Sequence, residues 1–189
     1  MSERRSERIL IVGGSGSGKS TFGKELGKVL DIEVHHLDKY FWKPGWVTTE
    51  RGEWERILSE LVTKESWIIE GNYARTFKMR AQYANKIYVF EFPTVKYIYG
   101  AFKRSFKTKM KIEKRTDMGD GCEEKWFDKE FYQWMWRFNK LELPKIYNSI
   151  DELEFDKNNL IIFKNRKEVK QYLKDLVVKK GTQNSHHKK

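Results

Sequence analysis

The chain has little cysteine, little proline and no long apolar run. Its single cysteine among 189 residues, Cys122, excludes an intramolecular disulfide and a four-cysteine zinc site, so we expect a reducing, cytoplasmic location. Three prolines and 15% aromatic residues exclude a collagen-like or low-complexity chain. No apolar run approaches the roughly 20 residues of a membrane span, and the polar start predicts no signal peptide.

Acidic residues are outnumbered as well. Lysine and arginine number 38, against 27 aspartates and glutamates, which gives a net charge of +11 at pH 7. Such an excess is typical of a solvated basic surface, of a protein with a polyanionic partner, or of a site for several phosphates. Charge alone leaves all three open.

Short apolar segments alternate with helical patterns along the chain. Five strands are predicted, at residues 8–12, 33–37, 66–70, 86–90 and 160–163. Helices are predicted near residues 20–30, 49–62, 94–110, 128–144 and 169–177. Thr49 is the predicted N-cap of the second helix. The alternation predicts a three-layer α/β fold with a mainly parallel five-stranded sheet, one domain over residues 1–178, and a disordered polar tail over 179–189.

A glycine-rich loop connects the first predicted strand to the first predicted helix. Residues 13–20 match G-x-x-x-x-G-K-[S/T], and a chance match in a chain of this length is on the order of 1%. In such a loop the backbone N–H groups wrap phosphate oxygens, the lysine reaches the β- and γ-phosphates, and the serine hydroxyl binds Mg²⁺. The predicted ATP and Mg²⁺ site comprises Gly13, Gly14, Ser15, Gly16, Ser17, Gly18, Lys19, Ser20 and Thr21. No motif separates ATP from GTP.

Further motifs resemble those of a bacterial family, the DNA topology modulation proteins. They are Leu37-Asp38, the aromatic segment 41–46, the segment 67–73 and Arg115-Thr116-Asp117-Met118 with Gly121-Cys122. The resemblance extends over about residues 9–176, and Glu70 stands where we expect that family to have aspartate.

That family is similar to adenylate kinase and other small P-loop kinases. The resemblance therefore implies a P-loop fold like that of nucleoside monophosphate kinases, with a helical lid inserted at about residues 103–130. It also implies phosphoryl transfer from ATP to a nucleotide, nucleoside or similar small acceptor. The family name suggests an alternative, a nucleotide-regulated protein that binds nucleic acid or regulates DNA topology. The sequence favours the kinase, because its basic residues gather in the expected lid and no nucleic-acid-binding signature is present.

Two carboxylates follow predicted strands, where ligands of parallel sheets bind. Asp38 is predicted to accept a proton from the acceptor hydroxyl or to hold a water on Mg²⁺, and its alternative role is a helix N-cap or a turn residue. Glu70 is the competing carboxylate on the Mg²⁺ side, and its alternative is a surface charge at the end of a strand.

Three arginines are candidates for the transferring phosphates. Arg104 and Arg115 are predicted to contact them from the lid, because a guanidinium binds two oxygens at once. Arg137 on the next helix would either reach the site when the lid closes or cover neighbouring aromatic rings.

The acceptor is expected to lie near the aromatic loop and the third strand. One of Trp42 and Trp46 is predicted to stack on a flat ring and the other to pack against the helix of Trp54. Possible phosphate or hydrogen-bonding contacts come from Arg51, Gly71, Asn72, Tyr73, Arg75 and Arg80. The sequence fixes neither the acceptor nor the oligomeric state.

Overall fold

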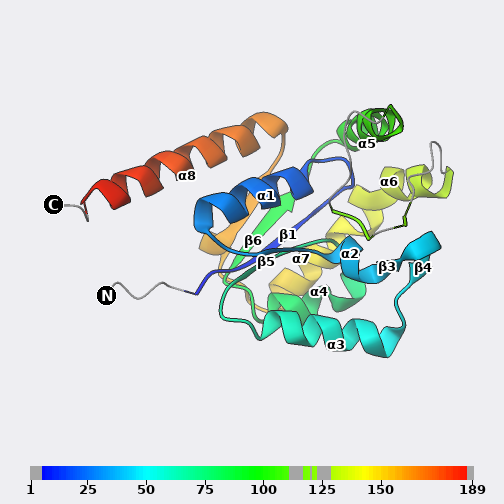
Figure 1. The fold of residues 1–189 in the computed structure, drawn as a ribbon, viewed down its shortest axis with the longest axis horizontal. Helices are drawn as coiled ribbons and strands as arrows, with labels where there is room; N and C mark the ends of the chain where they lie inside the picture. Colours follow the sequence, from blue (N-terminus) through cyan, green and yellow to red (C-terminus); the bar gives the residue numbers. More distant parts are fainter. Residues whose placement is uncertain (1–5, 111–116, 120, 123–128, 187–189) are drawn as a thin grey trace.

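The computed structural model describes residues 6–110, 117–119, 121, 122 and 129–186. Five parallel strands form its main sheet in the order β2-β5-β1-β6-β7 (Figure 1). Their bounds are Arg8–Gly13 (β1), Val34–His36 (β2), Trp67–Glu70 (β5), Lys86–Phe90 (β6) and Leu160–Phe163 (β7). The five predicted strands and their parallel arrangement are confirmed.

The central strand, β1, is buried on both faces, and its sequence is apolar for that reason. Ile9 to Val12 of β1 are fully buried, since β5 and β6 flank the strand and helices cover both of its faces. A continuous apolar run is what such an environment requires. The strand ends at Gly13, and the glycine-rich loop begins at the carboxyl edge of the sheet.

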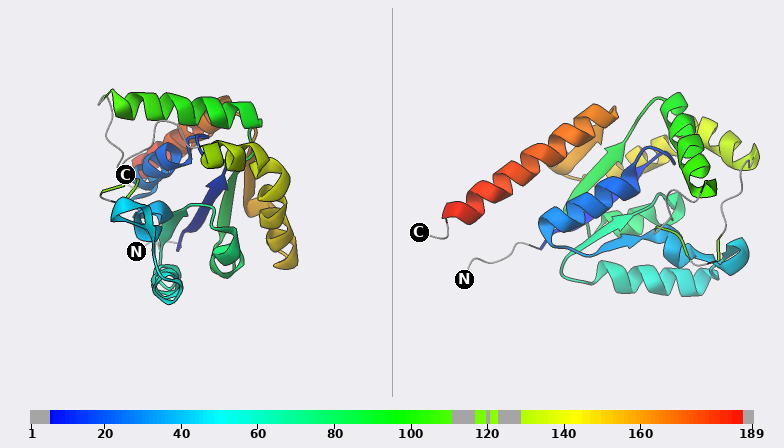
Figure 2. Two further views of the ribbon diagram at one scale, coloured as in Figure 1. Left: turned by 90° about the vertical axis from the view of Figure 1, so that its right-hand side faces the viewer. Right: turned by 45° about the horizontal axis from the view of Figure 1, so that its top comes forward.

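Helices cover both faces of the sheet. On one face lie α1 (Lys19–Leu30) and α8 (Arg166–His186), whose residues Phe22 and Tyr172 pack against Phe163 of β7. On the other lie α3 (Arg51–Val62), α4 (Ala74–Ala81) and α7 (Leu143–Glu152), as Figures 1 and 2 show. The predicted three-layer α/β fold is confirmed.

Two further helices lie together beyond the ends of β1 and β6. They are α5 (Thr94–Lys109) and α6 (Lys129–Leu141) (Figure 1). The sequence predicted one helix toward Pro144, whereas the structure has two, α6 and α7. Pro144 occupies the first turn of α7, where a backbone N–H would have no partner within the helix, so the lack of this group costs no hydrogen bond.

The start of α3 differs from the prediction. Glu50, not Thr49, is the N-cap, and its carboxylate accepts hydrogen bonds from the backbone N–H groups of Gly52 and Glu53. The Thr49 hydroxyl instead donates to the carbonyl oxygen of Tyr40 at 2.7 Å. Thr49 thus ties α3 to the preceding loop.

The last helix is longer than predicted. The sequence placed a polar tail from residue 179, but α8 continues to His186. Lys180 Nζ donates to the carbonyl oxygen of Val29 on α1 at 2.5 Å, so a polar contact extends the pairing of the two helices. Among the described residues, no helix has the length and apolar character needed to cross a membrane.

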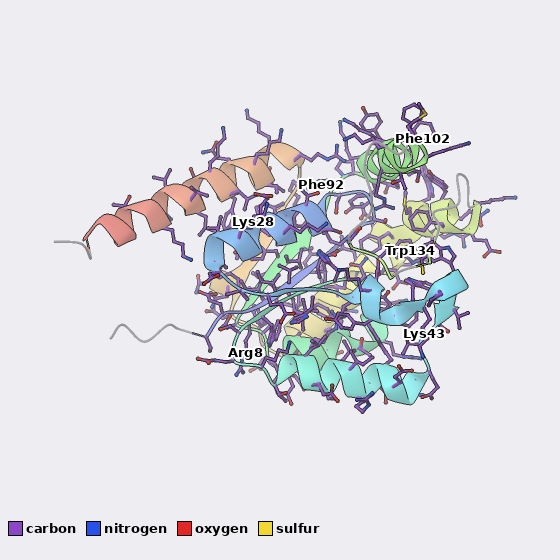
Figure 3. All side chains as sticks on the ribbon, in the orientation of Figure 1. Arg8, Lys28, Lys43, Phe92, Phe102 and Trp134 are labelled. Carbon is purple, nitrogen blue, oxygen red and sulfur yellow. The ribbon has the colours of Figure 1, made fainter. Side chains whose placement is uncertain are left out.

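A small hairpin follows β2, in the segment that the sequence analysis treated as an aromatic loop. After the short helix α2 (Leu37–Phe41), the strands β3 (Trp42–Lys43) and β4 (Val47–Thr48) pair in antiparallel fashion around the 3₁₀ turn η1 (Pro44–Trp46). Lys43, which Figure 3 labels on this hairpin, forms an ion pair of 2.6 Å with Glu53 of α3. A second 3₁₀ turn, η2 (Lys157–Asn159), precedes β7.

Candidate functional site

The glycine-rich loop leaves the first turn of α1 ready for an anion. Gly18 is the N-cap with φ of 99°, so no side chain caps the N–H groups of this turn, and the turn contains no acidic residue. The buried hydroxyl of Ser17 has no hydrogen-bond partner in the described part of the chain. A helix terminus and a buried hydroxyl in this state are suited to phosphate oxygens.

Neighbouring helices hold the loop in place. Gly16 has φ of 78°, and a Cβ there would lie 2.3 Å from the carbonyl oxygen of Tyr97. A Cβ on Gly100 of α5 would lie 2.0 Å from the carbonyl oxygen of Gly16. That same oxygen accepts a hydrogen bond of 2.9 Å from Arg166 at the start of α8. The loop is thus confined from two sides.

Lys19 and Ser20 meet a buried carboxylate from the neighbouring strand. Lys19 Nζ lies 3.7 Å from Glu70 Oε1, and Ser20 Oγ donates to Glu70 Oε2 at 3.1 Å. His36 Nδ1 donates to the same Oε2 at 3.0 Å, since an ionised carboxylate can only accept. The structure thus brings Lys19, Ser20 and Glu70 together, as the sequence analysis expected, and adds His36.

The charges in this cluster shift its pKa values. Burial lowers the pKa of Lys19, and Arg104 lowers it further, while Glu70, Asp38 and Asp117 act in the opposite direction. Burial alone would raise the pKa of Glu70, but the hydrogen bond from His36 and the charge of Lys19 outweigh it, and the pKa lies below its ordinary value. Glu70 is therefore ionised at neutral pH.

The oxygen atoms beside Lys19 fit Mg²⁺. In the described ranges no group of three or more His, Cys, Asp or Glu side chains is placed to hold a metal ion. Mg²⁺ in nucleotide sites needs less than this, because it keeps several waters and takes other ligands from phosphates. The Ser20 hydroxyl and the Glu70 carboxylate, 3.1 Å apart, provide the hard oxygen ligands that it prefers.

Asp38 contacts a tyrosine that follows β5, the strand beside β2 in the sheet. The Tyr73 hydroxyl donates to Asp38 Oδ1 at 2.7 Å. Burial, and then the charge of Asp38, raise the pKa of Tyr73, so its hydroxyl keeps its proton and can only be the donor. Tyr73 has φ of 39°, which is uncommon for a bulky residue. This backbone strain is held by the hydrogen bond and by ring contacts with Phe41 and Trp54.

Arg80 and Asn72 have a different role from the one predicted. Arg80 has no exposed surface, and its guanidinium donates to the backbone carbonyl groups of residues 71–73. The Asn72 side chain exchanges two hydrogen bonds with the backbone of Gly13, at 2.8 and 2.9 Å. Both residues thus shape the loop after β5 instead of reaching an acceptor, and Gly71 belongs to the same backbone arrangement.

Three other predicted arginines lie on the surface. Arg51 forms an ion pair of 2.8 Å with Glu55 on its own helix. Arg75 is exposed on the first turn of α4, and Arg137 is exposed on α6 beside Trp134. Within the described part of the chain, no hydrogen bond or ion pair joins any of them to the residues around Lys19.

The aromatic loop forms one packed cluster. Trp42 packs edge-on against Phe41 and against Trp46, with ring centroids 5.0 and 5.5 Å apart. Phe41 in turn packs against Trp54 of α3. Among the described ring contacts, Phe41 packs against Trp54, whereas the sequence analysis assigned this contact to one of the two tryptophans. Stacking of a tryptophan on a ligand stays a prediction.

Part of the predicted lid lies against this hairpin. Arg115 and most of residues 111–128 fall outside the described residues, but the short stretches 117–119 and 121–122 do not. The Gly121 carbonyl accepts a hydrogen bond of 3.1 Å from Gly45 N, and Cys122 Sγ donates to the Lys43 carbonyl at 3.3 Å. A Cβ on Gly119 would lie 2.3 Å from the Trp42 carbonyl oxygen.

Comparisons with known proteins give a likeness in fold. No family model and no curated protein sequence matches the chain. Among solved structures, it is similar to a shikimate kinase from Bacteroides thetaiotaomicron, with 16% identity, coverage of 90% of this chain and 96% of that one, and a TM-score of 0.47. It is also similar to a sugar kinase from Janibacter sp. HTCC2649, with 14% identity, coverage of 92% and 91%, and a TM-score of 0.38. The fold assignment rests on the sheet order and the loop, and membership of the DNA topology modulation family stays a prediction.

Sequence reasoning missed two residues of the site. The charge of Asp117 raises the pKa values of both Lys19 and Glu70. His36 donates a hydrogen bond to Glu70. Asp117 belongs to a segment that had been noted for its motif. His36 comes two residues before Asp38, at the same strand end, and this position was the available signal.

Proposed function

We propose that this protein is an ATP-dependent kinase that transfers the γ-phosphoryl group to a hydroxyl group of a small molecule. The observation that carries the proposal is the pairing of Asp38 with Tyr73, at the strand ends beside the loop lysine. The charge of Asp38 raises the pKa of Lys19, so a proton acceptor lies within electrostatic reach of a phosphate-binding cation. Phosphoryl transfer needs both.

The nucleotide is assigned to the loop of residues 13–21 and the first turn of α1. Lys19 binds the β- and γ-phosphates, and the unpartnered N–H groups of the turn surround them. Ser20 and Glu70 would hold Mg²⁺, and Asp38 would bind a water in its outer shell. When bound, Mg²⁺ neutralises phosphate charge and orients the β- and γ-phosphates. Arg104 adds positive charge from α5.

Asp38 acts on the acceptor. Tyr73 donates to its Oδ1, and the acceptor hydroxyl is assigned to the same carboxylate. The acceptor oxygen forms a bond to the γ-phosphorus while the bond from that phosphorus to the β,γ-bridging oxygen breaks. The hydroxyl proton passes to Asp38 and from there to solvent, and ADP leaves. Tyr73 fixes the direction in which the carboxylate faces.

ADP release in the presence of Mg-ATP tests the proposal. A coupled assay over nucleosides, sugars, polyols and nucleoside monophosphates should show release that depends on the acceptor. Release should vanish in Lys19→Ala and persist in Lys28→Ala, the matched control, because Lys28 is exposed on the same helix and paired with Glu25. ATP binding without release by any acceptor would contradict the kinase. Salt-dependent binding of DNA and RNA would then test the alternative.

A further inference from the structure

The buried carboxylate of Glu70 contacts side chains from two elements, α1 and β2. Ser20 Oγ and His36 Nδ1 donate to its Oε2 at 3.1 and 3.0 Å. Lys19 Nζ lies 3.7 Å from its Oε1, and the Glu70 side chain is only 9% exposed. Because water reaches so little of it, the carboxylate depends on these protein groups for its stability and its orientation.

Backbone pairing places His36 beside Glu70. The strands β2 and β5 are parallel, and their register aligns His36 with Glu70 and His35 with Ile69. Side chains at aligned positions of neighbouring strands lie on the same face of a sheet. The imidazole of His36, which is buried, therefore meets the carboxylate through the strand register. The sheet, and not the nucleotide loop, sets its position.

The neighbouring histidine has other contacts. Side chains alternate between the two faces along a strand, so His35 lies on the opposite face from His36. Its ring nitrogens lie 2.8 Å from the Tyr40 hydroxyl and 3.3 Å from Glu33 Oε2. Both histidines are buried on the same strand, and the described contacts join only His36 to Glu70. His35 thus provides an internal comparison.

Binding of ATP at the proposed site would change the surroundings of Glu70. Lys19 would turn to the phosphates, and the Ser20 hydroxyl would become a ligand of Mg²⁺. Both residues belong to the first turn of α1, directly after the loop. His36 belongs to the sheet, and nothing in the proposed reaction draws it away from the carboxylate. The hydrogen bond from His36 is therefore the contact that persists.

A persistent hydrogen bond of this kind matters for metal binding. A carboxylate that is already oriented loses less conformational entropy when it binds a metal ion. Loss of a hydrogen-bond partner behind a metal ligand typically weakens metal affinity by about 10–100-fold. The hydrogen bond from His36 also lowers the pKa of Glu70, which favours the anionic form that Mg²⁺ requires.

We propose that His36 is a positioning residue for Mg²⁺, which acts by holding the Glu70 carboxylate in place when Lys19 and Ser20 engage the nucleotide. This inference rests on the nucleotide and metal site of the proposed function and adds a residue to it. His36 acts through Glu70 and is not itself assigned as a metal ligand.

Calorimetric titration with ATP, in Mg²⁺ and in EDTA, tests the inference without any acceptor. The quantity compared is the gain in ATP affinity that Mg²⁺ produces. His36→Leu should reduce this gain about tenfold and leave ATP affinity in EDTA within about twofold. His36→Asn should restore most of the gain, because its Nδ2 stands at the same distance along the side chain as Nδ1 of the imidazole. His36→Gln, whose amide nitrogen lies one bond farther out, should restore less.

His35→Leu is the matched control, since it removes a buried histidine from the same strand and leaves the Glu70 contact intact. Urea denaturation verifies that each variant is folded. An undiminished gain in folded His36→Leu, or an equal loss in His35→Leu, would overturn the inference. If His36→Leu does not fold, the Asn and Gln variants carry the test, and equal gains in these two would overturn it.

The outcomes also separate this inference from the kinase activity. A loss of the Mg²⁺ effect in His36→Leu, in a protein that transfers phosphate to no acceptor, would overturn the kinase and leave the role of His36 standing. A parent protein that binds no ATP, or binds it equally well in EDTA, would overturn the metal site and this inference together.

Discussion

The two sides of the candidate site differ in which groups form them: backbone N–H groups on the nucleotide side and side chains on the acceptor side. On the nucleotide side, a backbone loop and a helix terminus provide most of the hydrogen-bond donors, and the chain path fixes them directly. On the acceptor side, side chains from β2, β5 and the hairpin meet only after folding, and several are engaged in holding the backbone. A backbone site is specific for phosphate in general, whereas a side-chain site determines which molecule is accepted.

After Lys19→Ala, the largest effect on catalysis should come from Asp38 on the acceptor side. Asp38→Asn removes the proton acceptor and keeps the shape of the side chain, so we expect kcat to fall about 10²–10⁴-fold. ATP affinity, measured by titration calorimetry, should stay within about twofold. Asp151→Asn, an exposed position on α7, should change neither quantity. A kcat within threefold of the parent would remove Asp38 from the reaction.

Arg80 distinguishes a structural arginine from a binding one. Arg80→Met removes the guanidinium donors to the carbonyl groups of residues 71–73, of which the Tyr73 carbonyl keeps a hydrogen bond from Thr76 N, and we expect the free energy of unfolding to fall by about 3 kcal/mol. Urea denaturation measures this directly. The exposed Arg56→Met, which breaks only a surface pair with Glu60, should cost less than about 1 kcal/mol. Equal losses in the two variants would contradict the structural role.

Tyr73→Phe should have a smaller effect. The variant removes one hydrogen bond to the Asp38 carboxylate and keeps the ring contacts with Phe41 and Trp54. We expect kcat/KM to fall about tenfold, because a hydrogen bond to a charged group contributes about 1.5–3 kcal/mol and water replaces part of it. A positioning role also requires the pH profile of kcat to shift in the variant. A profile that coincides with that of the parent would indicate packing alone.

The smallest expected effect is the loss, at acidic pH, of the contribution of Glu70 to the stability of the fold. The pKa of Glu70 is lowered in the folded protein, so its contribution to stability is complete above the ordinary glutamate pKa and is lost as the pH falls through the lower, folded value. The difference in unfolding free energy between the parent and Glu70→Gln should therefore be constant near neutrality and shrink below about pH 4.5. A difference that grows on acidification would reverse the assigned sign.

The same division explains how much the sequence could predict. Buried strands such as β1 and β6 are marked in the sequence by apolar runs, and the phosphate loop is marked by its glycine spacing. The predicted positions of these elements agree with the structure. Arg80 leaves no such signal. An arginine after a Gly-Asn-Tyr segment looks like an anion ligand until the fold turns it back onto the carbonyl groups of residues 71–73.

The hairpin and Asp117 illustrate the same limit from another direction. Two strands of two residues each are too short to show a period, and the position of Asp117 depends on backbone contacts with a segment about 75 residues earlier in the chain. Glu70 could be predicted in part. The sequence indicated its position at the end of a strand, but not its hydrogen bond with His36. The roles of Arg104, Arg115 and Arg137 stay predictions.

The confinement of the phosphate loop bears on the thermodynamics of nucleotide binding. Gly16 packs against the backbone of α5 and accepts a hydrogen bond from the guanidinium of Arg166, so the fold itself confines the loop. Its conformational entropy is lost during folding and is not subtracted again from the free energy of binding. For the proposed kinase, a substitution at Gly100 would displace Gly16, because a Cβ there would lie 2.0 Å from the Gly16 carbonyl oxygen, and nucleotide binding would weaken although Gly100 lies on α5 and outside the loop.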